Sequence, residues 1–388
     1  MSSHRPLFAG LVLAVLFAIL DLRSALAVEH NFAGSLQLDY HLAPERSTPT
    51  TAGPTFRGFT TEAALKATAD LNDHLSVNVK VCFGCHGFET DMAYAEYRFA
   101  DELDVRAGRF SPSFGAFNLR HDPANHRLSD KPLAYDMGRM LRLRDWNLGV
   151  LPAPFPDNGA EVSGTHWFGS TYQLDWAAHV VSGFKGSDAG ADLDFVQSRN
   201  GSLYYVDNND QPSYGGRVSL TRRFADVGDA TLGASVMHGA FDPRAQLSYT
   251  IAGADLSVRI RKMNFRIEYL VRRQDLDVSS PDRFRYEVPA SGGDHFLKHG
   301  AYAEAEIPVT PTLDIVGRFD LLYRSGNVLR DSPLQARSGV FRYTVGTAYT
   351  LRRGLRLKYS TELWSFSDLG YAGRHTAVSM HLGAAVAF

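Results

Sequence analysis

Two cysteines and a histidine stand together in one pentapeptide, Cys82-Phe83-Gly84-Cys85-His86, and the 388-residue chain has no other cysteine. Two thiols three positions apart can each form a thioether with one haem, and the histidine that follows them then lies close enough to bind the iron axially. The full five-residue pattern is much more specific than a Cys-x-x-Cys pair alone. It predicts a c-type haem (haem c) held by Cys82 and Cys85, with His86 as an iron ligand.

Two other chemistries could use the same residues. A disulfide between Cys82 and Cys85 would close a short loop, although two intervening residues make such a bridge strained and easily reduced. A zinc site built from Cys82, Cys85 and His86 would need a fourth ligand, and no obvious one lies close in the sequence. Haem is therefore the leading expectation, followed by a disulfide or structural thiol pair and then by a metal site.

The N-terminus indicates where this pentapeptide is delivered. His4 and Arg5 are followed by an apolar run over residues 7–20 and by a small-x-small sequence at residues 25–27. This order is typical of a secretory signal peptide covering residues 1–27. Thiols exported to an oxidising compartment do not stay free, so the pair is expected to be bridged, metallated or attached to a cofactor.

The composition fits a chain whose strands have one apolar face and one polar face. Aromatic residues make up 12% of the chain, glycines number 34 and the mean hydropathy is −0.20. After the signal peptide, no segment approaches the roughly 20 apolar residues of a spanning helix. A transmembrane barrel has such an average because half of each strand faces lipid and half faces water. A net charge of −2 argues against nucleic acid as a partner.

An alternation with a period of two residues is the main structural signal. In residues 378–388 the even positions are apolar and the odd positions are polar or small, and the segment ends on Phe388. The same alternation recurs over residues 355–363, 313–324 and 93–99, where charged residues occupy one face. A strand between lipid and an aqueous lumen requires this pattern, so the segments predict a transmembrane β-barrel.

Sixteen such segments can be counted. An even number suits a closed antiparallel barrel whose two termini share a side, with short turns at the periplasmic end and long loops outside. We expect strands near residues 31–40, 56–69, 74–82, 89–99, 102–110, 159–168, 171–183, 214–224, 229–239, 246–260, 263–275, 298–307, 312–324, 339–351, 354–366 and 375–388.

One stretch of sequence resembles a known family. Residues 94–110 (YAEYRFADELDVRAGRF) and Pro-Ser-Phe-Gly at residues 112–115 look like the phosphate-selective porins of the O and P type. The resemblance implies a sixteen-stranded barrel, usually trimeric, that passes small anions through an arginine-lined lumen. The matching motif describes a strand and its exit more than a binding site, so it supports the fold better than the solute.

The resemblance also gives a role to the third long connection, residues 111–158. In sixteen-stranded porins this loop typically folds inward and narrows the pore. Arg139, Arg142 and Arg144 cluster within it, and Lys131 lies nearby. These four cations are expected either to form an anion-selective constriction or to be solvated loop charges or contacts to other loops.

The alternation along residues 74–82 places the Cys82 side chain on the lumen side of this strand, at the extracellular end of the strand. A haem attached there would lie at the extracellular mouth of the barrel. His121 and His126 of the third loop are candidates for the second axial iron ligand, and so is Met92. For each of the three, the alternative is an ordinary loop or packed side chain.

Together these features predict an all-β protein whose residues 28–388 form a 16-stranded antiparallel transmembrane β-barrel of porin type in the outer membrane. Its partners would be outer-membrane lipid, small solutes or anions, and other subunits of a homotrimer. No Ser-His-Asp order, glycine-rich phosphate loop or zinc-protease helix is evident, so no enzymatic activity is expected.

The expected function is a channel that carries one haem c and exchanges electrons. A single haem cannot bridge an apolar band about 25 Å tall, so a partner cytochrome is also expected. Two alternatives remain: a plain diffusion porin in which the cysteines pin a loop, and a barrel that sheathes a partner cytochrome.

Overall fold

The structure is a computed structural model. No helix among the described residues is long and apolar enough to cross a membrane. The predicted signal peptide, Cys85 and His86 lie outside the described residues. The structure describes residues 29–42, 58–84, 87–135, 149–151, 153, 155–186, 195–199, 203, 205–275, 286–287, 295–325, 328–329, 337–367 and 376–388.

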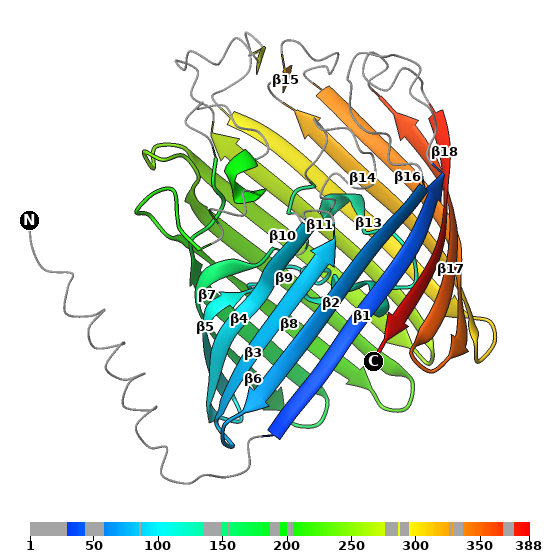
Figure 1. Cartoon of the computed structure of the whole chain (residues 1–388), viewed down its shortest axis with the longest axis horizontal. Helices are drawn as coiled ribbons and strands as arrows, with labels where there is room; N and C mark the ends of the chain where they lie inside the picture. Colours follow the sequence, from blue (N-terminus) through cyan, green and yellow to red (C-terminus); the bar gives the residue numbers. More distant parts are fainter. Residues whose placement is uncertain are drawn as a thin grey trace, which may run out of the picture.

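Sixteen strands form one closed antiparallel barrel, in which strands that follow one another along the chain are paired (Figure 1). A separate two-stranded sheet pairs β12 (Tyr286–Glu287) with β15 (Val328–Leu329). The barrel strands are β1 (Glu29–Leu42), β2 (Gly58–Asp70), β3 (Leu75–Gly84), β4 (Gly87–Ala100), β5 (Leu103–Phe110), β6 (Asp157–Phe168), β7 (Tyr172–Val181), β8 (Ser213–Phe224), β9 (Gly228–Ala240), β10 (Ser248–Ile260), β11 (Met263–Asp275), β13 (His295–Pro308), β14 (Leu313–Ser325), β16 (Arg337–Arg352), β17 (Leu355–Phe366) and β18 (Thr376–Ala387).

The predicted fold class is therefore confirmed. All sixteen expected segments are barrel strands, and the largest displacement at a strand start is in β13, expected at residue 298 and found to begin at His295. The small sheet of β12 and β15 was not expected. Two residues are too few to display a hydrophobic period, so nothing in the sequence distinguishes these strands from loop.

The barrel closes where its first strand meets its last. β1 pairs with β18 in a register that puts Ser35 opposite Ala387. The Gly34 amide donates a hydrogen bond to the Phe388 carbonyl at 2.9 Å, which extends this seam to the C-terminal residue. Closure leaves no strand edge with unpaired backbone groups, as a structure within a bilayer requires.

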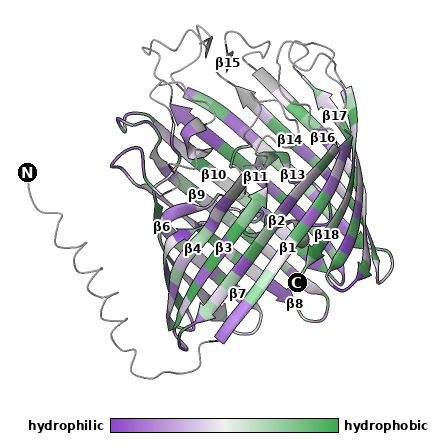
Figure 2. Cartoon of the chain, viewed as in Figure 1, coloured by the Kyte–Doolittle hydropathy of each residue, from purple (hydrophilic) through white to green (hydrophobic). Residues whose placement is uncertain are grey.

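Apolar and polar side chains separate to the two faces of the wall. In β1, Leu36 and Leu38 are 44% and 45% exposed, whereas Gln37 and Asp39, the residues that follow each of them, are buried. Hydrophobic and hydrophilic residues alternate in the same way along most strands (Figure 2). The outward face is thus suited to lipid, and the polar face is turned to the interior.

The third long connection lies inside the barrel. It contains three short 3-10 turns, η1 (Asn118–Arg120), η2 (Pro123–Asn125) and η3 (Leu133–Tyr135). η2 packs against β1 and β18, while η3 packs against β13 and β14. Other residues of the loop bond to β3, β6 and β11. The segment, blue-green in Figure 1, therefore contacts the wall at many points around the ring.

An apolar core fills part of this interior. Third-loop side chains pack there with residues that line the wall, and with Phe184 and Phe195 from the connection between β7 and β8. The rings of Phe184 and Phe195 stack with centroids 4.6 Å apart. The core of this protein thus lies within the barrel, and its aromatic members from the third loop are Phe114, Phe117, Tyr135 and Phe155.

Candidate functional site

A β-bulge in β4 turns an acidic side chain toward the lumen, close to the pentapeptide that resembles a haem-attachment motif. Lys80 pairs with Met92 and Val81 pairs with Thr90, so Asp91 is the extra residue on its strand. Asp91 Oδ2 lies 2.8 Å from Lys80 Nζ, and both side chains are almost wholly buried. The bulge thus places a buried ion pair near the end of the β3–β4 hairpin.

Cys82 belongs to the same neighbourhood. In β3, Asn78 and Lys80 are buried while Val77 and Val79 are exposed, and Cys82 continues the buried, interior-facing phase. Its thiol is free and half-buried, and it lies beside the Asp91 carboxylate. A free Cys82 does not support the disulfide alternative.

The third loop brings His121 to this cluster. His121 Nδ1 donates a hydrogen bond to the Asn118 carbonyl at 2.7 Å, which assigns the lone pair to Nε2. Nε2 then accepts from Lys80 Nζ at 3.1 Å and lies 3.7 Å from Asp91 Oδ2. Asp122 completes the group, since its Oδ1 is 2.6 Å from Lys80 Nζ. We name Lys80, Cys82, Asp91, His121 and Asp122 the Cys82 cluster.

His126, the other histidine candidate, lies elsewhere in the interior. Its Nδ1 donates to the Leu128 carbonyl at 2.8 Å, and its buried Nε2 has no hydrogen-bond partner among the described residues. Burial and the ammonium groups of Lys358 and Lys131 hold the pKa of His126 well below its ordinary value. Of the three candidates for a second iron ligand, the structure therefore places His121 in the Cys82 cluster and Met92 opposite Lys80. His126 lies near lysine side chains instead.

Of the four predicted constriction residues, the structure describes Lys131. Lys131 Nζ donates to the Ala153 carbonyl at 2.9 Å and lies 3.8 Å from Glu62 Oε1. It is buried among loop and wall atoms. Arg139, Arg142 and Arg144 lie outside the described residues.

A larger charge network joins the loop to the wall on β14, β16 and β17. Asp130 of the loop is fully buried and accepts from both Arg318 and Arg342, with the Arg318 contact at 2.8 Å. Asp320 Oδ2 lies 2.9 Å from Arg318 and 2.8 Å from Arg342. Glu362 Oε1 is a further 3.4 Å contact of Arg342. We name these five residues the Asp130 network.

Two further interior cations are also matched by acids. Arg106 Nη2 lies 2.6 Å from Glu161 Oε1, and Arg217 lies 2.5 Å from Asp255 Oδ2. The described part of the lumen therefore carries charges of both signs in close pairs. This differs from the arginine-lined lumen that the phosphate-selective resemblance implies.

Most of these wall residues are not among the residues that the sequence singles out for function. Each occupies an interior-facing position of its strand, so the alternation alone marks Lys80, Arg318, Arg342 and Glu362 as lumen residues. Their partners could not be read in the same way. Asp130 meets them only because the third loop folds back to the wall.

Comparisons with known proteins agree with the fold. No protein-family model and no curated protein sequence matches the chain. Solved structures similar to it include an anion-selective porin from Comamonas acidovorans, 13% identical with a TM-score of 0.56, covering 93% of this chain and 100% of that one. OmpF of Salmonella typhi, in complex with daunomycin, is 10% identical with a TM-score of 0.56, and 93% and 98% of the two chains are covered.

A third similar structure is the outer-membrane channel DcaP of Acinetobacter baumannii. It is 12% identical with a TM-score of 0.54, and the match covers 94% of this chain and 99% of that one. At such identities the likeness concerns the fold. The sixteen closed strands, the apolar outer face and these neighbours together define a porin-type β-barrel of the outer membrane.

Proposed function

We propose that this protein is an outer-membrane channel for small solutes or ions whose lumen carries one covalently attached haem c. Cys82 and Cys85 would hold the haem and His86 would bind its iron. The observation that carries this proposal is the Cys82 thiol, which is free, half-buried and turned to the interior beside the third loop. A haem bound there supplies a one-electron carrier.

The side chains around Cys82 suit such a group. His121 has the arrangement of many metal-binding histidines, because its Nδ1–H is held by a carbonyl and its Nε2 lone pair faces the Cys82 cluster. Lys80 now occupies that lone pair, so binding of His121 to a metal would replace one hydrogen bond. We therefore assign His121 as the candidate for the second axial position, in preference to His126.

The channel part of the proposal rests on the loop inside the lumen. The loop reaches wall strands around the ring, and its Asp122 and Asp130 carboxylates are paired with wall cations. Small solutes would pass between these pairs, and Arg139, Arg142 and Arg144 with Lys131 would favour anions at the constriction. The anion preference of the phosphate-selective porins would thus apply to this chain only through these four cations.

Electron exchange would need a second protein. The apolar band of a barrel is about 25 Å tall, and one haem occupies one place along it. We propose that Cys82 places the haem at the extracellular mouth, where it can exchange electrons with an external acceptor or a partner cytochrome. Association into a homotrimer belongs to the same proposal.

The deciding experiment is a pyridine haemochrome spectrum of the denatured protein, purified from a host that matures c-type cytochromes. A c-type band that persists after denaturation in the wild type and is lost in Cys85→Ala is the expected result. Cys82→Ala should likewise lose the double attachment. No band in the wild type would reject the haem and leave a plain diffusion porin.

Bilayer conductance separates the remaining readings. A channel should conduct as the purified protein, with or without haem. A sheath should fail to conduct alone and should copurify with a multihaem protein. Absence of both conductance and a haem band would reject both parts of the proposal.

A further inference from the structure

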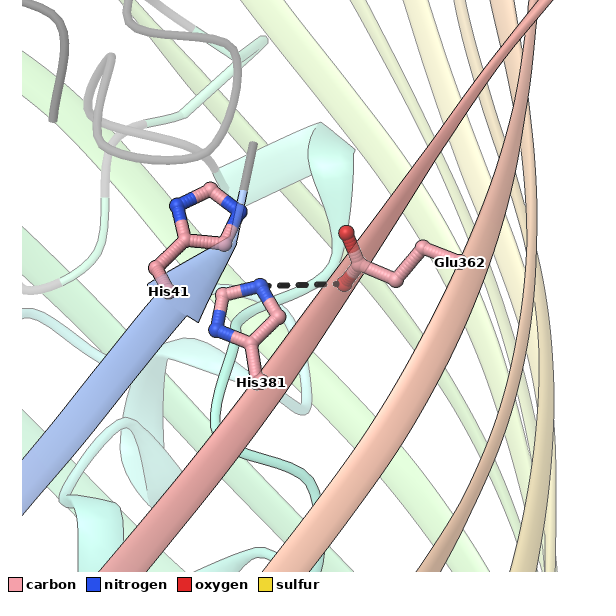
Figure 3. Close-up of side chains that lie close together, drawn as sticks. All are labelled: His41, Glu362 and His381. Atoms are coloured by element: carbon pink, nitrogen blue, oxygen red, sulfur yellow. Dashed lines mark ion pairs between the residues drawn. The ribbon is translucent and has the colours of Figure 1, made fainter. Parts of the chain in front are cut away.

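Three buried side chains meet at the seam of the barrel, away from the Cys82 cluster. His41 of β1 lies directly opposite His381 of β18 in the strand register. On β17, Ser360 pairs with His381, and Glu362 lies two residues further along the same strand. All three side chains turn inward (Figure 3), and their ligand atoms lie within 4.8 Å of one another. We name His41, Glu362 and His381 the seam triad.

The two imidazole rings are stacked. Their centroids are 4.1 Å apart and their planes differ by 12°. Two imidazolium ions so close would repel strongly in a buried site, so at least one of these rings is neutral. A neutral imidazole presents a nitrogen lone pair, which a metal ion can bind.

His381 is oriented as a metal ligand. Its Nδ1 donates to Asp39 Oδ2 at 2.8 Å. Its buried Nε2 points toward Glu362 Oε1 at 3.5 Å, as the dashed line in Figure 3 marks. A carboxylate that holds one ring nitrogen while the other faces the metal position is the usual second partner of a metal-binding histidine.

The charge around the triad favours a cation. Arg318 and Arg342 face Asp130, Asp320 and Glu362, and Asp39 adds a fourth carboxylate through His381. Two guanidinium groups therefore meet four buried carboxylates within this part of the described chain. Lys358, held by Gln37 and two loop carbonyls, is a further cation near Asp39, and counting it still leaves one carboxylate in excess.

From this geometry we propose that the seam triad binds one divalent transition-metal ion of the zinc type. Two imidazole nitrogens and a carboxylate are ligands that Zn²⁺ takes in proteins, whereas Ca²⁺ and Mg²⁺ prefer all-oxygen sites. Zinc bonds of about 2.0–2.1 Å need ligand atoms about 3.4 Å apart, so the triad would close by a small side-chain rotation. The ion would join β1, β17 and β18, the three strands at the seam.

The test uses untagged protein, stripped with a chelator and reloaded with Zn²⁺. Bound zinc is measured by mass spectrometry of the metal after dialysis against buffered zinc. We expect one equivalent in the wild type, at least a tenfold weaker affinity in His41→Ala and in Glu362→Gln, and no change in the control His238→Ala. His238 is an exposed β9 side chain bonded to Thr250.

A second readout follows the seam itself. Zinc should raise the thermal unfolding temperature of the wild type by several degrees and leave that of His41→Ala unchanged. Migration of unboiled barrel on a gel verifies that each variant is folded. Equal zinc uptake by wild type and His41→Ala, no uptake by folded wild type, or loss of uptake in Cys82→Ala instead of His41→Ala would each overturn the proposal.

Discussion

Tyr135 donates a hydrogen bond to Glu268 and thereby ties the third loop to β11 at a buried carboxylate. The same carboxylate accepts from the Ala116 amide at 2.8 Å, the Phe117 amide at 3.2 Å and the Tyr302 hydroxyl at 3.0 Å. Burial beside Glu268 raises the pKa of Tyr135 well above its ordinary value, so the phenol remains a donor. Four donors thus depend on one side chain of the wall.

Replacing Glu268 with alanine should release this part of the loop. The four donors would remain buried without their acceptor, which we expect to lower the free energy of unfolding by about 3–5 kcal/mol. Single-channel conductance should rise at the same time, because the loop would no longer be held across the lumen. Unfolding in urea and conductance in a planar bilayer measure the two effects.

Glu102→Ala is the matched control for that change. Glu102 is an exposed residue of the short turn between β4 and β5. The Glu102→Ala substitution should alter neither the free energy of unfolding nor the single-channel conductance. Wild-type conductance in a folded Glu268→Ala protein would show that this carboxylate does not position the loop.

Asp130→Asn tests the charge balance of the interior. The change removes one carboxylate that both Arg318 and Arg342 share, so the two guanidinium groups keep Asp320 as their closest common acid. We expect the permeability ratio of anions to cations to rise roughly threefold, which corresponds to about 0.6 kcal/mol. The reversal potential across a salt gradient measures this ratio.

A control for Asp130→Asn is Asp101→Asn, which removes the same charge from an exposed turn. Its reversal potential should match that of the wild type. If Asp130→Asn made the channel more cation-selective, or changed nothing, the Asp130 network would not influence permeating ions.

His121→Ala tests the assignment of the second axial ligand. The proposed attachment residues Cys82 and Cys85 are untouched, so the covalent c-type band of the proposed haem should remain. Loss of the imidazole should change the ligand-dependent spectrum and shift the reduction potential. His126→Ala is the natural comparison, because His126 lies outside the Cys82 cluster, and its spectrum should equal that of the wild type. Equal spectra for all three proteins would remove His121 from the site.

His126 should make the barrel sensitive to acid. Its pKa is held well below the ordinary value of 6.5 in the folded protein, so the unfolded chain takes up a proton at pH values where the folded chain does not. Stability should therefore fall as the pH drops below about 6.5, by at most about 1.4 kcal/mol per pH unit from this group.

Urea unfolding at pH 7.5, 6.0 and 5.0 measures that slope. His126→Gln should remove this contribution, and the exposed His238→Gln should keep the wild-type profile. A variant at position 126 with an unchanged pH profile would mean that the buried imidazole is not responsible.

The sequence by itself determined the strands and their faces. Each barrel strand must satisfy lipid on one side and the interior on the other, and this condition acts on every second residue without reference to the rest of the chain. The alternation therefore locates β18 and β1 to within a few residues, and it also assigns an inward phase to Cys82.

Contacts between residues that are far apart in the sequence were decided by tertiary structure alone. His41 and His381 are opposite one another only because the barrel closes and because the β1–β18 register has its particular value. Asp130 reaches Arg342 only because the third loop returns through the lumen. Neither a register nor a loop path leaves a local period in the sequence, since both depend on contacts between segments far apart in the chain.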